Sequence, residues 1–143
     1  MVRTALIERG AIAILTIALA AWFVVSLHDA HALRSARGIA DAAAPTQKEI
    51  RHALASLRGT ASGHPGDTEP DLVRATLLLR AGRPRAALSV LESIVRREPD
   101  NLRAMFTLAV VAPPIDPALG RMALRRAAAL NPAGGRNAWA PPR

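Results

Sequence analysis

Few side chains in this sequence combine in a pattern that could do chemistry. Four histidines are present, and His28 and His31 lie three positions apart, where one helix face would carry both, with Asp29 between them. A catalytic or structural metal needs at least a third ligand, and none is evident near this pair. We therefore interpret these residues as polar groups beside an apolar segment. His52 is expected on the polar side of a helix, and His64 falls in a glycine-rich loop.

The motifs of common enzyme classes are also missing. The chain has no cysteine, which excludes a thiol nucleophile and a disulfide. The glycine-rich stretch at residues 59–67 lacks the lysine and the preceding strand of a phosphate-binding loop, and no Gly-x-Ser-x-Gly elbow occurs. Glu92, Glu98 and Asp100 are better explained as helix-surface and capping residues. The sequence predicts a protein that is not an enzyme and holds no cofactor or metal.

The composition indicates an all-α protein with a basic surface. Aromatic residues make up only 3% of the 143 residues, so any core is built from Ala, Leu, Val and Ile. The formal net charge is +8, and 18 of the 19 basic residues are arginine because Lys48 is the only lysine. Such a surface suits nucleic acid, anionic lipid or an acidic protein. The arginines are scattered and aromatic stacking platforms are absent, which favours solvated helix faces and makes nucleic acid an unlikely partner.

After a short tail, residues 1–10, the chain contains an uncharged apolar stretch at residues 11–27. Its 17 residues would form about 26 Å of helix, the lower limit for crossing a bilayer. We predict a single transmembrane helix here, with contacts to membrane lipid. The alternatives are a signal peptide cleaved near Ala30-His31-Ala32, and a buried core helix. The arginines flanking the stretch nearly balance. Because a short N-terminal tail with a nearby small-residue motif resembles an export signal, we expect the domain outside the bacterial cytoplasmic membrane.

Downstream of this stretch the pattern predicts a linker or helical extension at residues 28–45 and then five helices. A capping helix and its loop take residues 46–67, with Thr46 and Glu49 forming a capping box at the helix start. Proline and glycine punctuation predicts the remaining helices at residues 70–81, 84–97, 102–112 and 117–130. Residues 133–143 read as a flexible tail.

Two of these helices carry the same pattern. In the first copy Pro84 precedes Ala87, Leu91 and Ile94 and the segment closes at Pro99; in the second, the matching residues are Pro117, Gly120, Leu124, Ala127 and Pro132. Every residue of the second copy follows its equivalent at the same interval, and Gly82 stands at a turn. This pattern resembles the tetratricopeptide repeat family, which stacks antiparallel helix pairs of about 34 residues each. The resemblance covers residues 68–132 as two repeats, with Ala75 and Ala109 paired and the missing residue placed in the second turn between helices.

The resemblance implies a groove lined by the first helix of each repeat, suited to an extended or helical peptide. By position, the groove residues are Leu72, Thr76, Leu79, Arg103, Phe106 and Val110. An equal alternative is that Leu72 and Phe106 belong to the core. The positions where the family carries a large aromatic residue hold Asp71, Leu78, Met105 and Ala112 here, so the shape of the groove differs from the family pattern.

The expected function is that of a short, membrane-anchored, non-enzymatic adaptor for protein–protein interaction. The partner would be a subunit of a bacterial envelope or membrane complex. Self-association is a further expectation, because stacked repeats generally need about three units for stability and only two are recognised. The alternatives are a basic binder of nucleic acid or anionic lipid, and a cleaved, secreted adaptor.

Overall fold

The computed structural model describes residues 2–60 and 67–132; for residues 2–14, 24, 25, 28, 59 and 60 it describes the backbone only. Every regular element of this part is an α-helix, as the composition predicts. The helices are α1 (Val2–Asp41), α2 (Gln47–Thr60), α3 (Glu69–Arg80), α4 (Pro84–Arg97), α5 (Leu102–Val111) and α6 (Pro117–Leu130).

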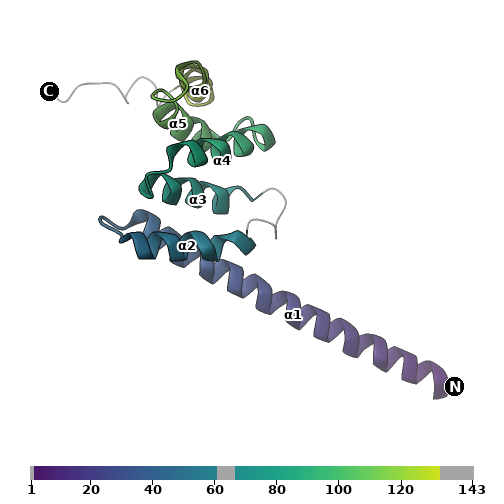
Figure 1. The fold of residues 1–143 in the computed structure, drawn as a ribbon. Helices are drawn as coiled ribbons and strands as arrows, with labels where there is room; N and C mark the ends of the chain where they lie inside the picture. Colours follow the sequence, from purple (N-terminus) through teal and green to yellow (C-terminus); the bar gives the residue numbers. More distant parts are fainter. Residues whose placement is uncertain (1, 61–66, 133–143) are drawn as a thin grey trace.

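The helices form three antiparallel hairpins that stack in chain order (Figure 1). α3 pairs with α4 and α5 pairs with α6, as the repeat pattern predicts. The first hairpin consists of α2 and the C-terminal part of α1, so most of the segment expected as a linker or helical extension at residues 28–45 is helical. This hairpin supplies the third unit that a stack of this kind generally needs.

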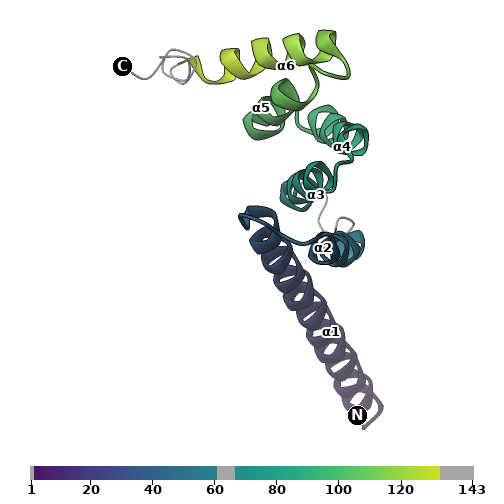
Figure 2. The same cartoon turned by 60° about the vertical axis from the view of Figure 1, so that its left-hand side comes forward.

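α1 is by far the longest helix, and its N-terminal part extends away from the stack (Figures 1 and 2). Forty residues correspond to about 60 Å of helix. Large apolar side chains on the extending part are exposed, among them Leu15, Leu19, Trp22 and Phe23. Within the described part of the chain, no helix is both long and apolar enough to cross a membrane. This finding does not support the transmembrane helix predicted at residues 11–27.

Two apolar clusters hold the stack together, and α3 contributes to both. The first joins α1, α2 and α3 through small and branched residues: Ala36, Ala40, Ile50, Ala53, Leu57, Val73 and Leu77. The second joins α3, α4, α5 and α6, and it includes Leu72, Ala75, Leu88, Leu91, Ile94, Met105 and Leu108. Alanines at the helix crossings let the backbones approach, and leucines fill the space between hairpins. The middle hairpin is therefore packed on both sides.

The helix ends follow from local chemistry. Thr46 and Glu49 form the predicted capping box: the Thr46 amide donates to Glu49 Oε2 at 2.7 Å, and the Glu49 amide donates to Thr46 Oγ1 at 3.2 Å. Asp116 accepts two amide hydrogen bonds at the start of α6. At the end of α3, Gly82 adopts a φ of +69°, which favours glycine, and its amide donates to the Leu79 carbonyl.

The register of the two recognised repeats differs from the prediction. The residues that cap α3 and α5, Thr68 and Asn101, are separated by the same interval as Pro84 and Pro117 at the starts of α4 and α6. The turn at residues 112–116 is longer than that at 81–83, because Pro113 and Pro114 end α5 early. Placing a deletion in this turn was therefore wrong. Leu108, which is fully buried, takes the place of Ala75, whereas Ala109 is half-buried.

Candidate functional site

The predicted groove residues separate into a buried group and an exposed group. On α3, Leu72 is 6% exposed and packs in the second cluster, so the alternative that it belongs to the core holds. Thr76 and Leu79 are half-buried, and the Thr76 hydroxyl donates to the Leu72 carbonyl at 3.0 Å. On α5, Phe106 is 58% exposed and Val110 is 64% exposed. Of the predicted groove residues, the exposed apolar ones are therefore carried by α5.

Phe106 and Val110 lie one turn apart on the same face of α5. Their exposure follows from how the hairpins stack. α3 packs against both α1 and α2, but α5 has no comparable contact with α3 and packs against α4 and α6 instead. The face of α5 that carries these two side chains is left uncovered by the neighbouring first helix. We call Phe106 and Val110 the α5 apolar pair.

An ion-pair ladder runs beside this pair and joins all three hairpins. Glu69, at the start of α3, lies 2.8 Å from Arg103 of α5 through Oε2 and 3.1 Å from Arg37 of α1 through Oε1. The contact with Arg103 is a hydrogen bond, whereas Oε1 is buried without hydrogen-bond geometry towards any partner. Arg103, the predicted cation of the groove, is thus held by Glu69 at the edge of the α5 apolar pair. Arg37 also lies 3.9 Å from Asp41 of α1, so two carboxylates and two guanidinium groups share this edge.

A polar junction connects the second hairpin to the third. Thr68 Oγ1 donates to Glu98 Oε2 at 3.0 Å and accepts from Asn101 Nδ2 at 3.0 Å. The same Asn101 amide donates to Glu98 at 2.8 Å, while its carbonyl oxygen caps α5 by accepting from Ala104. The sequence analysis explained Glu98 as a helix-surface or capping residue and did not predict this junction. The recurrence of capping residues, Thr68 and Asn101, at the repeat interval was the available signal.

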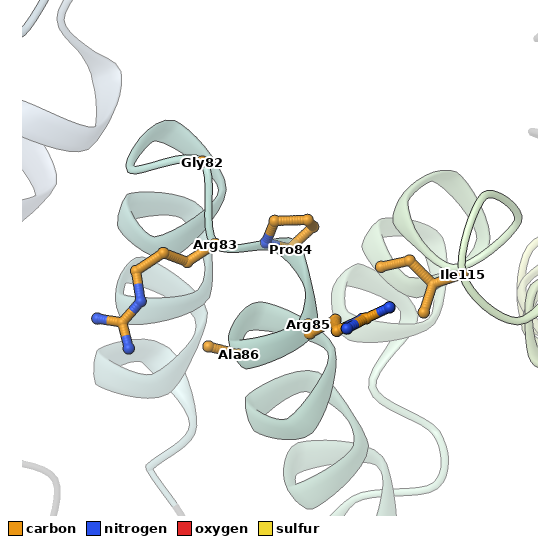
Figure 3. A pocket seen from close by; sticks show the side chains of 6 residues that line it. All are labelled: Gly82, Arg83, Pro84, Arg85, Ala86 and Ile115. Atoms are coloured by element: carbon orange, nitrogen blue, oxygen red, sulfur yellow. The ribbon is translucent and has the colours of Figure 1, made fainter.

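The structure also contains a shallow depression of about 520 Å³ at the turn between α3 and α4. It is lined by Gly82, Arg83, Pro84, Arg85, Ala86 and Ile115. Figure 3 shows the two arginine side chains extending in different directions rather than converging on one point. None of the predicted groove residues lines it. Without converging polar groups it is not organised for catalysis or for a small ligand.

Titratable groups in the described residues do not form a reactive site. No group of three or more His, Asp or Glu side chains able to hold a metal ion occurs among them. The pKa of the Glu49 carboxyl is lowered, first by the hydrogen bond from the Thr46 amide and then by the one from the Thr46 hydroxyl. This shift belongs to a helix cap. His64 lies outside the described residues.

Comparison with known families agrees with the helical arrangement. Residues 68–111, which span α3, α4 and α5, match the family model described as tetratricopeptide repeat. The matched segment contains the α5 apolar pair, the polar junction and Glu69. Neither a curated protein nor a solved structure matches the chain.

Proposed function

We propose that the chain is a non-enzymatic adaptor that binds a protein partner through α5, and the match of residues 68–111 to the tetratricopeptide repeat model supports this proposal. Repeats of this kind generally mediate protein–protein interaction. The observation that carries the proposal is the exposure of Phe106 and Val110 on one face of a repeat helix. Exposed aromatic and aliphatic side chains at a helix face that no neighbour covers are typical of an interaction site.

The chemistry of the surface narrows the kind of segment that would bind. A partner helix or extended segment with apolar side chains would cover the α5 apolar pair, beside which Arg103 is already paired with Glu69. In this proposal Leu79 and Thr76 form the half-buried margin of the site. Leu72 supports α5 from the core and does not touch the partner.

The test is capture of the partner by the full chain, extracted in mild detergent and identified by mass. Phe106→Asp and Val110→Asp should abolish capture of a partner that the wild-type chain retains, while circular dichroism shows unchanged helix content. Met122→Asp is the matched control, since Met122 is an exposed apolar residue, at 38%, on α6. Equal capture by Phe106→Asp and wild type would contradict the proposal.

We further propose that residues 11–27 attach the chain to a bacterial cytoplasmic membrane as a single span, with the repeats on the outer side. No described helix qualifies as a membrane span. The proposal is supported by the uncharged stretch in the sequence and by the exposure of Leu15, Leu19, Trp22 and Phe23. Apolar side chains exposed all round a helix are stable only when lipid or protein covers them. A partner in an envelope or membrane complex would fit that location.

Alkaline extraction of membranes separates an anchor from a peripheral protein, and the mass of the mature chain reports cleavage near residues 30–32. Since the chain has no cysteine, a single Ala43→Cys substitution allows labelling of intact cells with a membrane-impermeant maleimide. Labelling is expected if the repeats lie outside. Release of the full-length chain by alkali would contradict the anchor. A basic binder of nucleic acid or anionic lipid would instead show affinity that falls steeply with salt.

A further inference from the structure

The second helix of each hairpin carries a leucine at an equivalent position, and its exposure differs along the stack. Leu57 of α2 and Leu91 of α4 are fully buried, because α3 and α5 pack over them. Leu124 of α6 is their equivalent in the third hairpin and is 47% exposed. No described hairpin follows α6, which forms the end of the stack (Figure 2). The end therefore retains a residue whose equivalents are stacking contacts.

The residues around Leu124 distinguish this surface from the buried boundaries. Arg121 stands where α4 has the buried Leu88, Arg125 stands where α4 has Glu92, and all three of Arg121, Arg125 and Ala128 are exposed. We call Arg121, Leu124, Arg125 and Ala128 the terminal stacking face. Its apolar centre is thus flanked by two positive charges rather than surrounded by apolar groups.

These two arginines lack a carboxylate partner in the described part of the chain. The third arginine of α6, Arg126, pairs with Asp100, but no ion pair involves Arg121 or Arg125 among the described residues. Helix α6 itself contains no acidic residue, and neither does the sequence of residues 133–143. The charge on the terminal stacking face is therefore not balanced from within α6 or from the segment that follows it.

Boundaries between hairpins elsewhere in the molecule do balance arginine with a carboxylate. Glu69 of the second hairpin pairs with Arg37 of the first and with Arg103 of the third. Both interior boundaries thus combine an apolar contact with an arginine–carboxylate pair. Those interior pairs join the first helices of successive hairpins, whereas the terminal stacking face carries its two arginines beside Leu124 on a second helix. Carboxylates from a bound helix would balance these two arginines.

We propose that the terminal stacking face binds an acidic amphipathic helix of a partner protein, which packs on Leu124 and Ala128 as α5 packs on α4. Carboxylates flanking the apolar stripe of that helix pair with Arg121 and Arg125. The charge argument separates this occupant from two others. A second copy of α6 would bring four arginines together, and residues 133–143 carry two arginines and no acid. Opposite charge across the interface favours the acidic helix over both.

The experiment uses a designed helical peptide, matched in length to α6, with a Leu/Ala stripe flanked by glutamates, and a counterpart with lysines in place of the glutamates. The full chain is held in a zwitterionic nanodisc and carries a nitroxide on a single cysteine, Ala118→Cys, at the edge of the terminal stacking face. Ser89→Cys on α4 is the control position for the label, since it is exposed and lies away from α6. Loss of nitroxide mobility reports binding at the labelled site.

The glutamate peptide should immobilise the label at position 118 but not at position 89, and the lysine peptide should have no effect. Leu124→Lys should weaken binding about tenfold or more by removing the apolar centre. Met122→Lys, which changes an exposed apolar residue of α6 outside the terminal stacking face, should change the affinity less than twofold. Arg121→Glu with Arg125→Glu should reverse the preference so that the lysine peptide binds instead.

Four outcomes would overturn the proposal. The first is equal binding of the two peptides, and the second is binding unaffected by Leu124→Lys. The third is loss of binding in Phe106→Asp but not in Leu124→Lys, which would place the peptide on the α5 apolar pair. The fourth is a dimer in sedimentation that Leu124→Lys dissociates, which would make a second copy the occupant. Because the terminal stacking face and the α5 apolar pair are tested with separate substitutions, either proposal can fail alone.

Discussion

The helices α3 and α5 are equivalent members of successive hairpins, yet their corresponding faces have opposite environments. Val73 and Leu77 are the fifth and ninth residues after the cap of α3, and Phe106 and Val110 occupy the same places after the cap of α5. The first two are 2% and 0% exposed, whereas the second two are 58% and 64% exposed. The difference arises because α1 packs on α3, while α3 leaves α5 open.

This contrast shows how one repeat position serves either the core or a binding surface. On α3 the position is closed by alanines of α1, Ala36 and Ala40, which bring the helices near enough for Val73 and Leu77 to be buried. Between α3 and α5, Leu72 and Met105 share a buried cluster. Polar contacts lie beside this cluster: the Glu69–Arg103 pair and the junction of Thr68, Glu98 and Asn101. These contacts do not cover Phe106 and Val110, which stay exposed on α5.

The largest change in the free energy of unfolding is expected when a buried residue of α3 is truncated, and truncation of its exposed equivalent on α5 is the control. Leu77→Ala opens a cavity in a fully packed cluster and should lower the free energy of unfolding by about 2–5 kcal/mol. Val110→Ala removes an exposed side chain and should change it by no more than about 0.5 kcal/mol. Urea titration of the full chain in mild detergent, followed by circular dichroism, measures both. Similar values for the two variants would show that the faces are not different in the way described.

A second effect concerns the close approach of α6 to the turn before it. A Cβ at Gly120 would lie 2.8 Å from Pro113 Cγ, so Gly120→Ala forces the turn to move and should cost about 1–3 kcal/mol. Gly38 in α1 is the matched control, because nothing lies within 4 Å of its Cβ position. Gly38→Ala should stabilise the chain by up to about 1 kcal/mol through helix propensity. A destabilising Gly38→Ala would mean that α1 packs more tightly here than the structure shows.

How much of this arrangement follows from the sequence depends on the kind of signal. Local signals predicted the helices well: Pro84 and Pro117 mark the first residues of α4 and α6, and the Thr46–Glu49 capping box is present. The first hairpin was harder to predict. Residues 28–41 follow an apolar stretch without a break, and the small residues that make them a packing helix, Ala36 and Ala40, carry little pattern of their own.

The candidate site was only partly predictable for a different reason. Helical spacing places Leu72 and Phe106 on first helices of repeats, but it does not tell how far successive hairpins open. That opening is set by contacts between distant residues, such as Glu69 with Arg103, and it decides that Leu72 is core and Phe106 is surface. The one-residue error in register arose because an alanine pair, Ala75 and Ala109, outweighed the capping residues, whose spacing is the reliable marker.

A third prediction tests the polar boundary between α3 and α5. Asn101→Ala removes the cap of α5 and two hydrogen bonds of the junction, and should lower the free energy of unfolding by about 1–2 kcal/mol. Asn101→Asp sharpens the result, since it keeps the capping oxygen but places a second carboxylate beside Glu98. It should be destabilising at neutral pH, because the two negative charges repel each other. Equal stability of Asn101→Ala and wild type would show that the junction does not stabilise this boundary.

The smallest effect lies in the first hairpin, at the exposed capping box of α2. The pKa of Glu49 is lowered in the folded state by hydrogen bonds from Thr46. Its ionised form therefore stabilises the fold, and this contribution is complete at pH values above the pKa that Glu49 has in the unfolded chain. That contribution is lost as the pH falls through the folded pKa. Glu49→Gln should therefore lower the Tm slightly at pH 7 and leave it unchanged below both pKa values, whereas Thr46→Ser should retain the wild-type profile. A Tm difference that persists at low pH would show that Glu49 acts through packing rather than charge, and that the first hairpin depends on this end of α2 more than its exposure indicates.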